Sequence, residues 1–319
     1  MTERTSRTAA EEIPDRASGG TQEVPRLVTP DMLREWPVPS PGGSKYSRGQ
    51  VLIVGGDCST PGAAMLAGVA ALRMGAGRLS LAVADGVARQ VAVAVPECGT
   101  TALAEDADGA ITGAGAREAL QRELERADAV LVGPGLGNPD GARCLLEEIV
   151  DVLPSTAPVV LDAFGLTVLP DAAPECAQAL AGRLVLTPNT GELARLLGRD
   201  EIGDGEEAAA CVEAAERYSA SVGCGRWVAA DGAVWQMTTG DTGLGTSGSG
   251  DVVAGAAAGL LSRGATLTQA LVWAKYVHAA AGDALATRFG RVGYLAGELP
   301  GQLPLVLRSL RGDGGDRAA

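Results

Sequence analysis

Near the start of the chain lies Val51-Leu52-Ile53-Val54-Gly55-Gly56, and Pro61 then opens an alanine-rich segment, residues 62–74. Four consecutive apolar residues that end in glycine are typical of a strand buried on both faces of a parallel sheet. Proline is favoured at the first position of a helix, and small side chains let that helix pack closely on the sheet. This stretch predicts a strand, a glycine-rich turn and a helix.

The same alternation continues along the chain. Further strands are expected at residues 78–83, 129–132, 159–162 and 184–187, and further helices at 114–127, 140–153 and 271–286. This pattern predicts an α/β fold, with a mostly parallel sheet covered on both faces and ligand sites at the carboxyl ends of its strands. The composition predicts a disordered leader over residues 1–24, one domain over 25–310 and a flexible tail over 311–319.

Charge and cysteine content argue against several classes of protein. Lys and Arg number 26 and Asp and Glu number 39, giving a net charge of −13 that disfavours binding to nucleic acid or acidic membranes. No apolar run is long enough to span a membrane, and residues 1–25 are too polar for a signal peptide. The six cysteines lack C-x-x-C spacing, which indicates reduced thiols rather than disulfides or a zinc site. A cytoplasmic protein is expected.

One motif joins three chemical features in six residues, Thr246-Ser-Gly-Ser-Gly-Asp251, directly before an apolar helix over residues 252–261. Gly248 and Gly250 let the backbone turn tightly and approach a ligand. The free N–H groups at the start of the helix favour phosphate oxygens. Asp251 places a carboxylate beside that phosphate, where a general base for a hydroxyl nucleophile is needed. Taken alone, Asp251 is also explained as an ordinary helix cap.

Three other turns follow apolar strands. The turn over residues 55–64 lacks the spacing of a dinucleotide fingerprint, so it is either a ligand loop or a structural turn. Gly133-Pro-Gly-Leu-Gly137 offers bare backbone to a substrate. Asn189-Thr-Gly-Glu192 begins a helix, where Glu192 either holds a metal-bound water or is a carboxylate at the helix dipole.

His278 is the only histidine in the sequence and falls on an alanine-rich helix. Such a residue is more often a packed or hydrogen-bonded core histidine than a catalyst. With a single histidine, catalytic-triad chemistry and a histidine-based metal site are both disfavoured.

Together and in this order, these motifs resemble those of the ADP-dependent (S)-NAD(P)H-hydrate dehydratases, members of the ribokinase-like superfamily. The resemblance covers residues 28–310 and includes Leu33-Arg-Glu-Trp36 and Val277-His-Ala-Ala-Ala-Gly-Asp283. It implies a ribokinase-like three-layer fold. The epimerase domain that is fused to many members of the family is expected to be absent.

The resemblance implies that the chain converts the S epimer of hydrated NADH or NADPH back to the normal dinucleotide. ADP, or alternatively ATP, would phosphorylate the ring hydroxyl with Asp251 as catalytic base and Mg²⁺ as cofactor, and phosphate would then leave. The implied contacts are Ala63, Gly135, Asn189 and Asp251 to the hydrated dinucleotide, Gly225, Gly248, Ser249 and Gly250 to the nucleotide, and Glu192 to the metal. A homo-oligomer, in particular a tetramer, is also implied.

Three positions depart from the family pattern. Asn189 stands where a histidine is usual, and Phe164 where a second aspartate is usual. The nucleotide segment Lys-Gly-x-x-Thr is replaced by a shorter one over residues 222–227, with Cys224 at the lysine position and Arg226 as an alternative source of charge. Nucleotide binding is therefore the function most affected.

Two other functions fit parts of the pattern. A kinase of the same fold, acting on a thiazole or pyrimidine precursor, would use the same glycine motif and Asp251. A catalytically weak protein that binds dinucleotide would explain the altered segment over residues 222–227.

Overall fold

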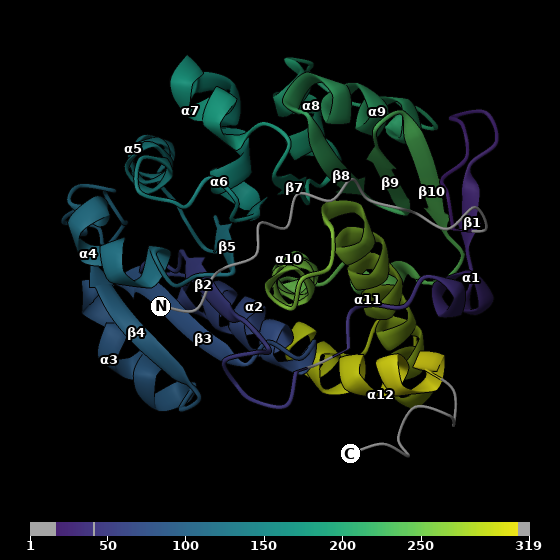
Figure 1. Ribbon diagram of the computed structural model, residues 1–319, viewed down its shortest axis with the longest axis horizontal. Coiled ribbons are helices and arrows are strands. Elements are labelled where there is room, and N and C mark those ends of the chain that lie inside the picture. The colour runs from purple at the N-terminus through teal and green to yellow at the C-terminus, as the bar shows by residue number, and fades with distance from the viewer. Residues whose placement is uncertain (1–16, 41, 312–319) are drawn as a thin grey trace.

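The computed structural model describes residues 17–40 and 42–311 and shows a central sheet between two layers of helices (Figure 1). Within the described residues the sheet has ten strands, in the order β1-β10-β9-β8-β7-β6-β5-β2-β3-β4. Their bounds in that order are Arg26–Val28, Ala233–Met237, Trp227–Ala230, Ala220–Cys224, Leu184–Leu186, Val159–Leu161, Ala129–Val132, Gln50–Val54, Arg78–Ala84 and Cys98–Leu103. Only β9 runs antiparallel to its neighbours, so the predicted mostly parallel sheet is confirmed.

The helices cover both faces of the sheet, because alternate strand residues point to opposite sides. Val51 and Ile53 of β2 belong to one buried cluster, and Leu52 and Val54 belong to the other. One cluster involves α1 (Pro30–Glu35), α2 (Pro61–Arg73), α3 (Asp85–Ala94), α10 (Ser249–Ser262), α11 (Leu267–Phe289) and α12 (Leu299–Arg311). The other involves α4 (Ala116–Leu124), α5 (Pro139–Val150), α6 (Ala163–Thr167), α7 (Pro174–Leu180), α8 (Thr190–Leu197) and α9 (Glu207–Tyr218). In Figure 1, α5, α7, α8 and α9 lie above the sheet and α2, α10, α11 and α12 lie below it.

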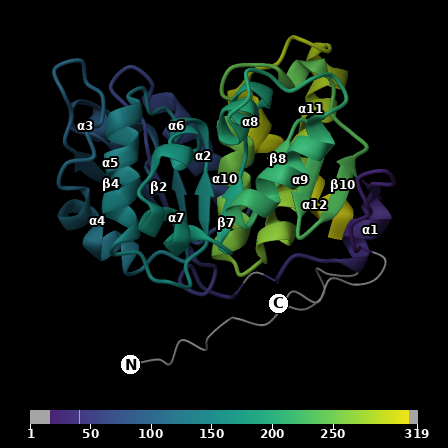
Figure 2. The ribbon, with the colours of Figure 1, turned by 90° about the horizontal axis from the view of Figure 1, so that it is seen from above.

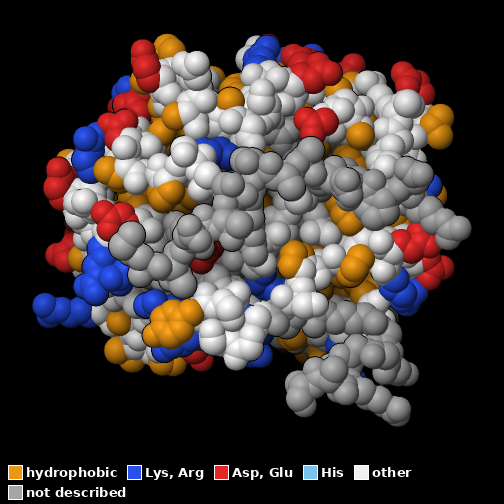
Figure 3. Space-filling view, viewed as in Figure 1, with side chains coloured by type: hydrophobic (Ala, Val, Ile, Leu, Met, Phe, Trp, Pro, Cys, Tyr) orange, Lys and Arg blue, Asp and Glu red, His pale blue; other side chains and the backbone are white. Residues whose placement is uncertain are grey.

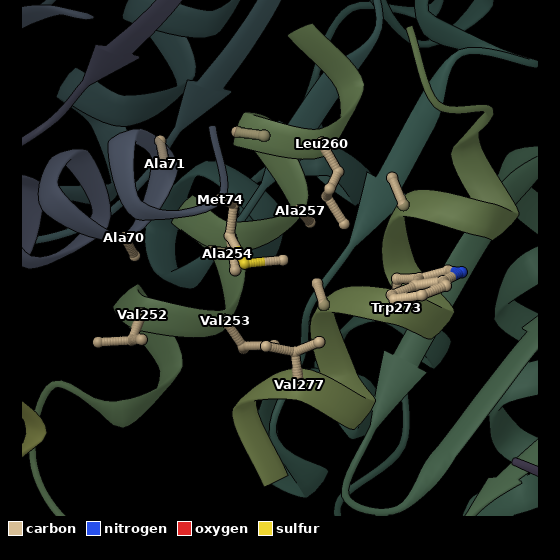
Figure 4. Close-up of a cluster of buried hydrophobic side chains, with 14 of the residues drawn as sticks. Ala70, Ala71, Met74, Val252, Val253, Ala254, Ala257, Leu260, Trp273 and Val277 are labelled. Carbon is tan, nitrogen blue, oxygen red and sulfur yellow. The ribbon is translucent and has the colours of Figure 1, made fainter. Parts of the chain in front are cut away.

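Helix α10 packs unusually closely on α2, and small residues make this contact (Figure 4). A Cβ atom added to Gly255 would lie 2.1 Å from the carbonyl oxygen of Ala67, and one added to Gly259 would lie 2.5 Å from that of Ala71. Neither position has room for a side chain. This contact fixes where α10 begins, at the carboxyl edge of the sheet.

Gly255→Ala is therefore expected to destabilise the fold, because the new methyl group must push two helix backbones apart. Overpacking of this kind costs roughly 1–3 kcal/mol in the free energy of unfolding. Gly301→Ala on α12 is the matched control, since a Cβ there meets nothing within 4 Å. Denaturant unfolding of both variants is the measurement. Equal stability would contradict the close helix contact.

The described chain begins within the predicted leader. Ala17 is fully buried and its carbonyl oxygen accepts a hydrogen bond of 2.9 Å from the Trp235 indole, and Gly20 pairs with Val234 of β10. Residues from Ala17 onward thus pack on the sheet beside β1 and α1, at the edge seen on the right of Figure 2. The rest of the expected leader, residues 1–16, and residues 312–319 of the expected tail lie outside the described residues.

The described surface of the molecule carries charges of both signs, and the helices within the described residues are not of the membrane-spanning kind. On the described part of the face shown in Figure 3, Lys and Arg side chains are interspersed with Asp and Glu. Among the described helices, none combines the length and apolar character needed to cross a bilayer.

Candidate active site

The glycine-rich turns after β2 and β5 interlock at the carboxyl edge of the sheet. Gly56 and Asp57 donate backbone hydrogen bonds of 2.8 and 2.9 Å to the carbonyl oxygens of Pro134 and Gly135. A Cβ atom added to Gly135, whose φ is +71°, would lie 2.4 Å from the Thr60 carbonyl oxygen and 3.0 Å from the Ala63 Cβ. Gly135 is thus half-buried beside the start of α2, and only glycine fits at this position.

Asp57 holds these turns in place. Its carboxylate is 2% exposed and accepts hydrogen bonds from the backbone N–H groups of Ile111, at 2.9 Å, and Gly137, at 2.6 Å. Burial raises the pKa of Asp57, and these two hydrogen bonds partly offset the increase. Asp57 is thus a structural residue beneath the loop that carries Gly135.

Three carboxylates gather where β6, β7 and α10 meet. Burial raises the pKa of Asp251 to about 6, and the nearby charge of Glu192 adds to the effect. Burial also raises the pKa of Asp162, at the end of β6, to about 7; the hydroxyl of Thr187, 2.7 Å away, counteracts this and the charges of Asp251 and Glu192 reinforce it. A half-buried carboxylate with a pKa near 6 is suited to accept a proton at neutral pH.

Asn189 and Glu192 form a capping box at the start of α8. The Asn189 side-chain oxygen accepts from the Glu192 N–H, and a Glu192 carboxylate oxygen accepts from the Asn189 N–H, both at 2.9 Å. Burial raises the pKa of Glu192, while the Asn189 N–H and the charge of Arg195 lower it. Glu192 is therefore a carboxylate at a helix start, which is one of the two roles expected for it. Its second carboxylate oxygen remains available to bind another group.

The start of α10 presents backbone N–H groups at the same edge. Ser249 does not contribute its amide, because that N–H donates to the Thr246 carbonyl oxygen. The amides of Gly248, Gly250 and Asp251 have no backbone acceptor within the described part of the chain. A Cβ on Gly250 would meet nothing within 4 Å, so the space in front of this helix start is open.

His278 supports this loop from α11. It is 8% exposed, and its Nε2 lies 3.0 Å from the Ser249 hydroxyl. Burial, together with the charge of Lys275, lowers the pKa of His278 to about 3, so the ring is neutral at physiological pH. The prediction of a hydrogen-bonded core histidine is confirmed, and its partner belongs to the glycine motif.

The predicted site residues fall at one edge of the sheet. Gly135 touches Ala63 on α2, and Leu66, one turn further along α2, lies 2.6 Å from where a Cβ of Gly248 would stand. That same Cβ position is 3.8 Å from a carboxylate oxygen of Asp251. Asp251, Glu192 and Asn189 are connected as described above, and Gly225 lies at the same edge, in the turn from β8 to β9.

The segment over residues 222–227 buries the position at which the resemblance to the family places a lysine. Cys224 is the last residue of β8 and is buried against α9, where the Cys211 side chain hydrogen-bonds it and lowers its pKa. Arg226 is exposed at the turn. Position 224 therefore faces the core rather than the open edge.

Sequence reasoning missed Asp57, Asp162 and Thr187 as parts of the site. The signal for Asp162 and Thr187 was present, because each polar residue directly follows a buried strand, β6 or β7. Asp57 gave no signal, since both of its partners lie more than fifty residues away in sequence.

The described residues contain no group of three or more His, Cys, Asp or Glu side chains arranged to hold a metal ion. Mg²⁺ in nucleotide sites is held by one or two carboxylates together with phosphates and water. The free oxygen of Glu192 and the neighbouring Asp251 fit that requirement.

Comparison with known proteins identifies the family. The model of the NAD(P)H-hydrate dehydratase family matches residues 51–305. The chain belongs to the NAD(P)H-hydrate dehydratase family. The ADP-dependent (S)-NAD(P)H-hydrate dehydratase of Xanthomonas campestris is 41% identical over 290 residues, which are 89% of this chain and 97% of that protein.

Other members of the dehydratase family are longer. The bifunctional NAD(P)H-hydrate repair enzyme of Moorella thermoacetica is 36% identical over 297 residues, and the match covers 89% of this chain but 54% of that enzyme. The chain thus spans about half the length of such bifunctional relatives.

Solved structures agree with this family. The ADP/ATP-dependent NAD(P)H-hydrate dehydratase of Bacillus subtilis, co-crystallised with ATP and Mg²⁺, superposes with a TM-score of 0.72 at 26% identity, covering 89% of this chain and 98% of that one. A ribokinase-like superfamily protein of Enterococcus faecalis gives a TM-score of 0.74 at 21% identity over 89% of this chain and 96% of that one, which supports the fold alone. The predicted ribokinase-like fold is confirmed.

Proposed function

We propose that this chain is a nucleotide-dependent dehydratase that restores NADH or NADPH from the S epimer of its hydrate. The observation that carries the proposal is the half-buried Asp251, with its raised pKa, beside the free amides at the start of α10. Support comes from the 41% identical Xanthomonas relative, whose name states this activity and whose length the chain nearly spans.

The geometry suggests how the residues act. Asp251 accepts the proton of the ring hydroxyl as the hydroxyl oxygen attacks the terminal phosphorus of the nucleotide, and the bond from that phosphorus to the leaving phosphate oxygen breaks. The free N–H groups of Gly248, Gly250 and Asp251 stabilise the charge on the transferred phosphoryl group. The ring nitrogen lone pair then expels phosphate to give an iminium, and the adjacent ring carbon loses a proton to water as the carbon–carbon double bond of the dihydronicotinamide forms. Ser249, held by His278, positions this loop.

The residues that contact the dinucleotide and the metal are proposed from where they lie at the carboxyl edge of the sheet. The half-buried backbone at Gly135, the adjacent Ala63 and the side chain of Asn189 would contact the hydrated dinucleotide. Glu192 would hold Mg²⁺ through its free oxygen, and the metal would neutralise phosphate charge. ATP is included as a co-substrate because the Bacillus relative is described as ADP/ATP-dependent. Assembly into a tetramer and a cytoplasmic location stay predictions.

The pH dependence of kcat/KM is expected to report Asp251. A base must be deprotonated, so kcat/KM should fall about tenfold per unit as pH drops below the pKa of about 6 and level off above it. His278 is neutral throughout this range, so its titration should not appear in the pH profile. Glu192→Gln should shift the fall in kcat/KM to lower pH, because it removes a negative charge that raises the Asp251 pKa. A profile that is flat from pH 5 to 8 would contradict the assignment of the base.

The alternative of a small-molecule kinase can be tested directly. The purified chain is incubated with hydrated NADPH, Mg²⁺ and ADP or ATP, and in parallel with ATP and a hydroxyethylthiazole or hydroxymethylpyrimidine. The proposal predicts recovery of reduced-nicotinamide absorbance and no phosphorylation of either alcohol. A hydroxyethylthiazole kinase of Pyrococcus horikoshii shares the fold at 17% identity and a TM-score of 0.54, which supports no more than the common architecture.

A further inference from the structure

Lys275 is one of only two lysines in the sequence, and α11 places it at the carboxyl edge of the sheet. One face of α11 runs alongside β8 toward that edge. Thr268 lies 3.2 Å from Ser221, hydroxyl to hydroxyl, and Leu271 fills the space over Gly223, with its Cδ1 3.1 Å from the position of an added Cβ. One turn further, residue 275 occupies the same helix face.

The periodicity of helix α11 and that of strand β8 together bring Lys275 to the turn after β8. Strand residues alternate sides, so Ser221 and Gly223 face α11, and the chain then turns at Gly225, whose φ is +52°. Residue 225 is an exposed glycine, and a Cβ there would meet nothing within 4 Å. The Lys275 side chain therefore borders open space above Gly225.

The same face of α11 continues to the glycine motif. His278, three residues after Lys275, contacts Ser249 at the start of α10. Lys275 is close enough for its charge to contribute to the lowered pKa values of His278 and Cys224. It thus lies between the turn at Gly225 and the free amides of α10.

The Lys275 ammonium lacks an anionic partner among the residues that the structure describes. Within residues 17–40 and 42–311, its ammonium takes part in no ion pair or hydrogen bond. The side chain is only partly accessible, and burial lowers its pKa. An ammonium that is poorly solvated and unpaired destabilises the fold, which a ligand anion would offset.

A cation at this edge would offset the negative charge that gathers there. Asp162, Glu192 and Asp251 contribute carboxylates to this edge, whereas the nucleotide carries several negative charges of its own. The exposed Arg226 makes no recorded contact with these groups in the described chain, and Cys224 faces the core. Arg195, whose charge acts on Glu192, is also exposed, whereas Lys275 is a half-buried cation on the adjoining face of α11.

We propose that the Lys275 ammonium binds a phosphate group of the nucleotide co-substrate, between Gly225 and the start of α10. This assignment rests on the proposed nucleotide dependence and adds the residue that supplies positive charge. The cation then comes from a helix on one face of the sheet rather than from the end of strand β8. It is a binding and positioning residue, and it takes no proton in the reaction.

Calorimetric titration of ADP into Lys275→Met is the first test. A charge-assisted hydrogen bond to phosphate is worth about tenfold to a hundredfold in affinity, so the ADP Kd should rise by that factor. The NADPH Kd should stay nearly unchanged, and the unliganded variant should be at least as stable as the wild type because an unpaired ammonium is gone. Lys275→Arg should retain more ADP affinity than Lys275→Met.

Lys45→Met is the matched control. Lys45 is exposed at the opposite edge of the sheet, beside Tyr46, Gln50 and Asp128, so its removal should leave the ADP Kd unchanged. An ADP Kd that is the same in Lys275→Met and the wild type would overturn the assignment. So would a variant that loses NADPH affinity and keeps ADP affinity, because Lys275 would then belong to the dinucleotide site.

A second measurement uses the wild-type protein and needs no variant to fold. ADP should protect Lys275, but not Lys45, from an amine-reactive reagent, as read by mass spectrometry of the two lysine peptides. Modification of Lys275 at the same rate with saturating ADP would contradict the proposal. Failure of the wild type to bind ADP at all would instead overturn the nucleotide dependence, and the Lys275 assignment with it.

Discussion

Asp251→Asn is expected to lower kcat for dehydration by roughly 10²–10⁴-fold, the contribution of a positioned general base. Asparagine keeps the size and hydrogen-bonding ability of the side chain but cannot accept the hydroxyl proton. The Kd values for NADPH and ADP should change little, because the α10 amides and the glycine turns remain. Stopped-flow or steady-state recovery of reduced-nicotinamide absorbance measures the rate.

The same substitution should stabilise the protein at neutral pH. The folded-state pKa of Asp251, about 6, lies above its unfolded value of 3.8, so ionised Asp251 opposes folding at pH 7 and this cost is relieved as pH falls through 6. Allowing for its partial exposure, removing the charge should add roughly 1–3 kcal/mol to the free energy of unfolding. Asp31→Asn, in the first turn of α1 with a side chain 91% exposed, is the matched control and should change neither rate nor stability appreciably. A rate above about a tenth of the wild-type value would return Asp251 to the role of a helix cap.

Asp57→Ala should produce the largest loss of stability, roughly 2–5 kcal/mol, because the buried N–H groups of Ile111 and Gly137 lose their acceptor. The loop that carries Gly135 would then lose its anchor, so the KM for the hydrated dinucleotide should rise as well. Urea unfolding and steady-state kinetics are the measurements.

Asp106→Ala is the control for this change. Asp106 also accepts two backbone hydrogen bonds, from Asp108 and Ala110, both at 3.0 Å, but water can reach these groups and replace the carboxylate. Its loss should cost much less than that of Asp57. Equal losses in the two variants would show that the buried position of Asp57 is unimportant.

The central strands were predictable because their residues are apolar on both faces. Residues 51–54, 129–132 and 184–187 each coincide with an observed strand to within one residue. Strand β8, Ala-Ser-Val-Gly-Cys, was not predicted, because small and polar residues carry little of the signal that identifies a buried strand. Strand β9, next to β8, runs antiparallel to both β8 and β10, which a repeating strand–helix pattern does not suggest.

Motif order and spacing identified most of the candidate site, because parallel strands bring their carboxyl ends to one edge. What could not be predicted depends on which elements pack together. The pairing of Asp162 with Thr187 requires the register of β6 against β7, where Leu161 lies beside Leu186. The place of Lys275 requires knowing which face of α11 covers β8. Sequence alone pointed to Cys224 and Arg226 instead, since they occupy the altered segment.

The most direct test of the account is recovery of reduced-nicotinamide absorbance from the S epimer of hydrated NADPH, with Mg²⁺ and ADP or ATP, by the wild type and Asp251→Asn. The account predicts nucleotide-dependent recovery by the wild type and a loss of roughly 10²–10⁴-fold in the variant. No recovery by the wild type with either nucleotide, or equal recovery by both proteins, would contradict it.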